Sequence, residues 1–141
     1  ERHNAIDAET ANLTVSVDGN TKSQTQTTTR QQSIIVRGSD WSNLWFATVS
    51  IANTLAIVEK NAGTSTTRAS AAISYAANTD FHLSVTCSGE SITAELTGMD
   101  TEAISYASAS FNKTATIVGL RAIGQLTDWV AQVFDNFKVT A

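Results

Sequence analysis

The chain has 141 residues, of which 42% are hydrophobic and 16% charged, and its formal net charge is −4 at pH 7. A chain of this length is expected to form one domain, residues 1–141, that buries roughly two thirds of the surface its unfolded form exposes. The acidic balance and the scattered Lys and Arg residues argue against nucleic-acid binding, which needs clustered cations. No hydrophobic run is long enough to span a membrane.

The first predicted strand covers residues 11–17, where Leu13, Val15 and Val17 alternate with polar residues. This alternation is typical of a strand with one buried and one solvated face. Residues 21–32 follow; they are rich in Thr and Gln and poor in hydrophobic side chains. We predict a polar loop or arm there, either mobile, at a sheet edge or in contact with another chain.

The stretch that organises the rest of the chain is residues 34–57. An apolar run ending at Arg37, a polar turn over residues 39–43 and two further β-rich runs predict three successive strands. In the run 44–51 both alternating sets begin with hydrophobic side chains. We therefore expect a central strand covered on both faces, with Trp45 in the core.

The clearest predicted hairpin pairs residues 81–87 with residues 92–96 around a Ser-Gly-Glu turn. Each strand alternates, which predicts a buried Cys87 and an exposed His82. Weaker or longer strands are predicted at residues 66–73, 103–107, 114–122 and 129–140. Because short alternating runs recur without a helical period, we predict an all-β antiparallel sandwich of roughly ten strands.

The order of several motifs resembles that of laminin-G-like, concanavalin A-like jelly rolls of bacteriophage virion proteins and secreted bacterial proteins. The motifs are Arg37-Gly-Ser-Asp-x-Ser-Asn-x-Trp45-Phe46-Ala47, the Asp80–Val85 region, Gly119-Leu120-Arg121 and Phe134-Asp135-Asn136-Phe137. The resemblance implies a jelly roll that binds glycans or takes part in assembly. The strand that usually precedes residues 2–7 is missing, so we expect part of a longer chain, or a first strand supplied by another chain.

Asp135 is the candidate metal ligand. It shares the alternation of Ala131, Val133, Phe137 and Val139, and a carboxylate in line with hydrophobic residues needs a partner. The resemblance implies that such an acid can hold a structural calcium ion through oxygen ligands. The alternative is a carboxylate that accepts hydrogen bonds from backbone N–H groups or Arg.

Four aromatic residues are expected at strand ends or in turns, where an aromatic face can stack on a sugar or anchor a protein contact. These candidate ligand-binding residues are Trp41, Trp129, Tyr75 and Tyr106.

The chain is not expected to be an enzyme. Relatives of the resembling fold include glucanases with a Glu-x-Asp-x-Glu-like arrangement of catalytic carboxylates, and no such triplet is present in the sequence. We predict a structural or adhesive virion module, in capsid decoration or a tail or fibre, that forms a homo-oligomer or contacts other virion proteins and weakly binds cell-surface glycans. The alternative is a carbohydrate-binding module of a secreted bacterial surface protein or polysaccharide-degrading enzyme. Either function places the chain in a virion or outside the cell.

Overall fold

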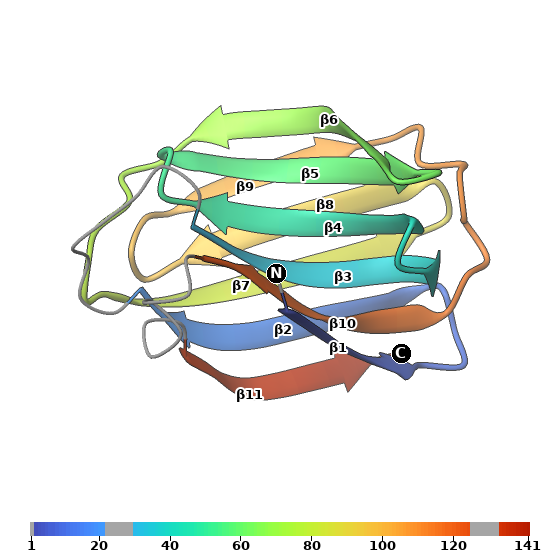
Figure 1. Ribbon diagram of the computed structural model, residues 1–141, viewed down its shortest axis with the longest axis horizontal. Coiled ribbons are helices and arrows are strands. Elements are labelled where there is room, and N and C mark those ends of the chain that lie inside the picture. The colour runs from blue at the N-terminus through green and yellow to red at the C-terminus, as the bar shows by residue number, and fades with distance from the viewer. Residues whose placement is uncertain (1, 22–29, 125–132) are drawn as a thin grey trace.

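The computed structural model describes residues 2–21, 30–124 and 133–141. Within these residues eleven strands form two antiparallel sheets that pack face to face (Figure 1). The predicted all-β antiparallel sandwich is therefore confirmed. None of the described residues belongs to a helix with the length and hydropathy needed to cross a membrane.

The six-stranded sheet faces the viewer in Figure 1 and the five-stranded sheet lies behind it. The front sheet has the order β1 (Arg2–Asp7), β10 (Ile117–Ile123), β3 (Gln31–Asp40), β4 (Asn43–Ser50), β5 (Thr54–Asn61) and β6 (Thr64–Ala72). The rear sheet has the order β11 (Val133–Thr140), β2 (Leu13–Asn20), β7 (Asp80–Ser88), β8 (Ser91–Thr97) and β9 (Glu102–Tyr106).

The core between the sheets is built from alternating residues, as the sequence predicts. On β7 the side chains of Phe81, Leu83, Val85 and Cys87 point inward and are buried, and the residues between them are exposed or half-buried. β7 and β8 form the predicted hairpin. Burial raises the pKa of the Cys87 thiol to about 11, so this residue is an apolar core side chain and not a reactive thiol.

Strands β3, β4 and β5 are buried on both faces over most of their length. Trp45 lies in the core between the sheets, and its indole Nε1–H donates to the carbonyl oxygen of Phe111 at 2.8 Å. The opposite set of side chains forms a second hydrophobic cluster on the outer face of the same sheet, consisting of Ile35, Leu44, Phe46, Ala56 and Val58. The prediction of a central strand covered on both sides is confirmed.

The buried guanidinium of Arg37 connects three separate loops at one end of the sandwich. Its Nη2 donates to the carbonyl oxygen of Gly89 at 2.7 Å, its Nη1 to that of Ala109 at 3.3 Å and its Nε to that of Ala11 at 3.4 Å. Arg37 also has a φ of 50°, where the ladder between β3 and β4 breaks. The bulge turns the side chain inward, and the three carbonyl groups replace its hydration.

The predicted polar loop or arm over residues 21–32 follows β2, as expected, but its last two residues belong to β3. Thr21 is buried, and its hydroxyl donates to the carbonyl oxygen of Ala76 at 2.6 Å. Arg30 is buried, and Gln31 begins β3. Residues 22–29, the middle of the predicted arm, lie outside the described residues.

The first and last strands need two corrections. Arg2–Asp7 is itself a strand and pairs with β10, so the residues near the start of this chain supply an edge strand of the six-stranded sheet. On β11 the register shifts between Asp135 and Lys138, and Asn136 has a φ of 52°. This bulge reverses the alternation, so Asp135 lies beside Asp18 on the exposed face while Val139 packs against the core.

Candidate functional site

The four predicted aromatic residues occupy different environments. Trp41 is exposed, with 44% of its surface accessible, in the turn between β3 and β4. Tyr75 and Tyr106 are half-buried and pack against the core; the Tyr106 ring lies 5.7 Å from that of Trp45. Trp129 lies outside the described residues. Of the three predicted aromatic residues that the structure describes, Trp41 is the most exposed.

The turn that carries Trp41 is held by hydrogen bonds from its own residues. Asp40 Oδ1 accepts the backbone N–H of Ser42 at 2.7 Å, and the Asn43 amide donates to both Asp40 oxygens at 3.1 and 2.9 Å. This is an Asx-type turn, in which a short polar side chain replaces a backbone partner.

Two other loops hold the same turn from outside. The backbone N–H of Ala62 donates to Asn43 Oδ1 at 3.0 Å, and Asn112 Nδ2 donates to the carbonyl oxygen of Asn43 at 2.8 Å. Gly63 N–H donates to the carbonyl oxygen of Ser42 at 2.9 Å. The backbone on both sides of the Trp41 side chain is therefore ordered before any ligand arrives.

Trp41 forms one wall of a groove of about 410 Å³ on the outer face of the six-stranded sheet. The groove is lined mainly by hydrophobic groups and glycine, with Ser39 and two carboxylates as its polar side chains: Ala5, Ile6, Asp7, Ile35, Gly38, Ser39, Asp40, Trp41, Leu44 and Ile117. Leu44 and Ile35 belong to the outer hydrophobic cluster, so the floor of the groove is part of that cluster. A mainly apolar concavity with a few polar groups is the usual form of a small-ligand site.

The two carboxylates of the groove are anionic at neutral pH. A side-chain hydrogen bond from Thr116 and the backbone N–H of Glu9 lower the pKa of Asp7 below its ordinary value. Hydrogen bonds from Asn43 and from the Ser42 backbone do the same for Asp40. Each carboxylate has about four lone-pair positions, so oxygen acceptors remain for a ligand that carries hydroxyl or ammonium donors.

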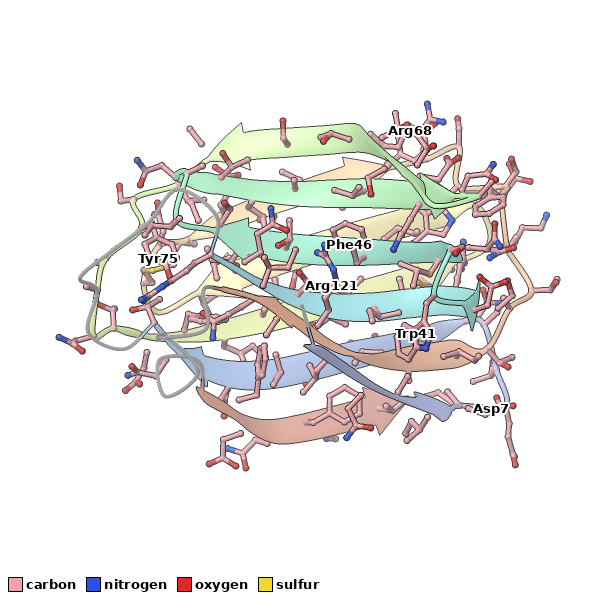
Figure 2. All side chains as sticks on the ribbon, in the orientation of Figure 1. Asp7, Trp41, Phe46, Arg68, Tyr75 and Arg121 are labelled. Carbon is pink, nitrogen blue, oxygen red and sulfur yellow. The ribbon has the colours of Figure 1, made fainter. Side chains whose placement is uncertain are left out.

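The outer face continues from the groove toward Phe46 and Arg121, and Figure 2 shows these two residues and Trp41 on the side that faces the viewer. The Arg121 guanidinium carbon lies 4.4 Å from the centre of the Phe46 ring, and Nη1 donates to Gln31 Oε1 at 3.1 Å. The arginine thus covers the central aromatic ring of the outer cluster.

Asp135 lies in a different groove, on the exposed face of the five-stranded sheet, together with Asp18, Asn136 and His82. The Asp18 carboxylate accepts from Asn136 Nδ2 at 2.7 Å and lies 2.6 Å from His82 Nδ1. No group of three His, Cys, Asp or Glu among the described residues is arranged to hold a metal ion. Asp135 Oδ1 accepts the backbone N–H of Asn136 at 2.8 Å, which is the alternative that the sequence left open.

Four contributors to the Trp41 groove from distant strands were not foreseen. Ala5, Ile6 and Asp7 come from β1, and Ile117 comes from β10, far from Trp41 in the sequence. The pairing of β1 with β10 and of β10 with β3 brings them together. The available signal was the apolar run that begins near residue 114, but its place beside the Trp41 turn depends on sheet order.

No protein-family model matches the chain, and no curated protein matches it. Solved structures do. A carbohydrate-binding module, CBM66, from Bacillus subtilis superposes with a TM-score of 0.72 at 17% identity, covering 98% of this chain and 78% of that one. CG-16, a homodimeric agglutinin from chicken liver, gives a TM-score of 0.70 at 11% identity, covering 99% and 100%. Sheep galectin-11 superposes with a TM-score of 0.67 at 8% identity, covering 98% of this chain and 96% of that one.

At these identities the similarity shows the fold alone. The chain has the β-sandwich of carbohydrate-binding modules and galectins, which agrees with the concanavalin A-like jelly roll that the sequence predicts.

Proposed function

We propose that the chain is a non-catalytic carbohydrate-binding module and that the Trp41 groove is its glycan site. The observation that carries the proposal is the exposed indole of Trp41, 44% accessible, at the wall of a mainly apolar groove whose polar side chains include two carboxylates. The similarity of the fold to a carbohydrate-binding module and to galectins supports it.

The chemistry of a sugar ring suits this groove. The C–H face of a pyranose packs on an indole, which offers a large, flat apolar surface at the end of a short side chain. The hydroxyl groups at the edge of the ring donate to carboxylate oxygens, here Asp7 and Asp40. The ordered Asp40–Asn43 turn reduces the entropy lost on binding, because Trp41 is carried by a backbone that is already fixed.

The same carboxylates are poorly suited to hydrolysis. A glycoside hydrolase needs one carboxyl group that stays protonated near neutral pH and acts as the general acid. Hydrogen bonds lower the pKa of both Asp7 and Asp40, so neither holds a proton at neutral pH. We therefore propose binding without cleavage.

Of the two functions that the sequence suggested, the similar structures favour the alternative, a carbohydrate-binding module of a secreted protein, over a structural module of a virion. Secretion and homo-oligomer formation stay predictions. The mass of the purified protein in solution, by light scattering, tests the second of them.

The proposal is tested by screening the protein on a glycan array and measuring the affinity of the best ligand by calorimetry. Trp41→Ala should weaken binding at least tenfold, because it removes the stacking surface. Phe137→Ala is the matched control: Phe137 is also an exposed aromatic residue, at 36%, but lies on β11 of the other sheet. It should retain the affinity within about twofold.

A silent array, or equal affinities for the protein and its Trp41→Ala variant, would overturn the assignment of this groove. Release of reducing sugar from the bound glycan would overturn the non-catalytic part of the proposal. Far-UV circular dichroism of both variants establishes that each is folded before the affinities are compared.

A further inference from the structure

The charges in the Trp41 groove are all of one sign. Its ionisable lining residues are Asp7 and Asp40, and no Lys, Arg or His is among the described residues that line it. Both carboxylates are ionised at neutral pH because their hydrogen bonds favour the charged form. A groove with an exposed indole, an apolar floor and two negative charges differs from a sugar-binding surface without charged groups.

These lining residues are therefore expected to favour cationic ligands over neutral ones, and neutral ligands over anionic ones. A uronic acid or a sulfated sugar brings a like charge to the carboxylates and is disfavoured. A neutral hexose gains stacking and ordinary hydrogen bonds. A protonated amine gains more, since it donates three charge-assisted hydrogen bonds and is also attracted to the face of an indole.

We infer that the preferred ligand of this groove is a glycan with free, protonated amino sugars, and that Asp7 and Asp40 together with Trp41 receive the ammonium group. This inference rests on the proposed function and narrows it from carbohydrate in general to one chemical class. It assigns charge selection to Asp7 and stacking to Trp41.

Two cations of the outer face, Lys60 and Arg121, lie outside the lining of the groove. Lys60 on β5 is opposite Leu44 in the strand register, one strand beyond the groove, and does not line it. Arg121 lies over Phe46 and does not line it either. Replacing Lys60 should therefore have the opposite effect to replacing Asp7: it removes a positive charge that repels a cationic ligand, so binding of that ligand should strengthen.

The experiment compares four tetrasaccharides of the hexose that the array selects: the amino sugar, its N-acetylated form, the neutral hexose and the uronic acid. Affinities are measured by calorimetry at about pH 5.5, where the amine is charged and both aspartates remain ionised. We expect the amino form to bind about five- to tenfold more tightly than the N-acetylated form, and the uronic acid to bind most weakly. The ratio of amino to N-acetyl affinity should shrink as salt concentration rises.

Variants identify the residues that produce the ratio of amino to N-acetyl affinity. Asp7→Asn should lower it about threefold, because the amide keeps an acceptor but loses the charge. Asp135→Asn is the matched control: Asp135 also accepts a nearby backbone N–H, from Asn136 at 2.8 Å, but it lies on the five-stranded sheet. It should leave the ratio unchanged. Lys60→Gln should raise the ratio slightly.

The outcomes separate this inference from the proposed function. Binding of neutral and amino forms with equal affinity, abolished by Trp41→Ala, would overturn the inference and leave the glycan site in place. Failure of all four sugars to bind would overturn both. A preference for the amino form that survives Asp7→Asn and Asp40→Asn together would also overturn the inference, because the charge selection would then come from elsewhere.

Discussion

The outer faces of the two sheets differ in chemistry. On the five-stranded sheet, outward residues of β7 and β8 are polar and exposed or half-buried, and they alternate strictly with buried ones. On the six-stranded sheet, β3, β4 and β5 bury both sets, and the outward set includes Ile35, Leu44 and Phe46. One face is therefore a solvated surface, while the other is apolar and ends in the Trp41 groove.

The difference is the reason for placing the proposed ligand site on the six-stranded sheet. A polar outer face needs no partner, since water satisfies its side chains. On the six-stranded sheet the outer hydrophobic cluster is itself buried, so it stabilises the sheet, and Ile35 and Leu44 of this cluster also line the Trp41 groove. The sandwich core needs one apolar face per sheet, and here one sheet has two.

The largest expected effect concerns Arg37, which joins β3 of the six-stranded sheet to three loops by hydrogen bonds. Arg37→Met should lower the free energy of unfolding by about 3–4 kcal/mol, because one buried and two part-buried carbonyl groups lose their donor. Arg68→Met is the control: Arg68 lies on exposed β6 and pairs with Glu59 at 3.1 Å near the surface. It should cost less than about 1 kcal/mol. Urea unfolding measures both losses, and equal losses would refute the role of Arg37 in joining the three loops.

The next effect compares the two outer faces directly. Phe46→Ala should cost about 2–3 kcal/mol, because it removes a buried ring and the surface on which Arg121 rests. Thr86→Val, on the outer face of β7, should change stability by no more than about 0.5 kcal/mol, since the Thr86 hydroxyl, 3.0 Å from that of Thr14, is exposed to water. If Phe46→Ala proved as mild as Thr86→Val in urea, the contrast between the faces would be wrong.

The smallest effect is electrostatic and belongs to the solvated face. Hydrogen bonds from Asn136 and His82 lower the pKa of Asp18 below its ordinary value of 3.8. A lowered pKa in the folded state means that Asp18 stabilises the protein above pH 3.8 and loses this contribution as pH falls through the folded-state pKa. Urea midpoints between pH 6 and 2 should therefore fall less steeply for Asp18→Asn than for the unmodified protein. Parallel curves would contradict the role given to this carboxylate.

Much of the fold could be predicted from the sequence because β-strand burial has a period of two. The alternation of Phe81, Leu83 and Val85 predicted a one-sided strand, and the unbroken apolar run around Trp45 predicted a two-sided one; the structure confirms both. The predictions failed where the period breaks. The bulge at Asn136 reverses the alternation of β11; Asn adopts a positive φ more readily than most residues, but the residue type alone does not locate a bulge.

The candidate site could be predicted only in part. Trp41 was recognisable because a tryptophan in a polar Asp-Trp-Ser turn is unlikely to be core. Asp7 and Ile117 were not recognisable, since they reach the groove through the order of β1, β10 and β3, which is a long-range property of the sheet. Tyr75 and Tyr106 were sensible candidates by position, but the structure packs both against the core.

The most direct test of the central claim is a nuclear magnetic resonance titration of the isotope-labelled protein with the best glycan. The account predicts shifts of the Trp41 indole N–H and of backbone signals from Gly38, Leu44 and Ile117, which line the groove. Signals from the groove of the five-stranded sheet, such as those of Asn20 and His82, should stay in place. Saturable shifts confined to Asn20, His82 and their neighbours, with the Trp41 indole unmoved, would contradict the account.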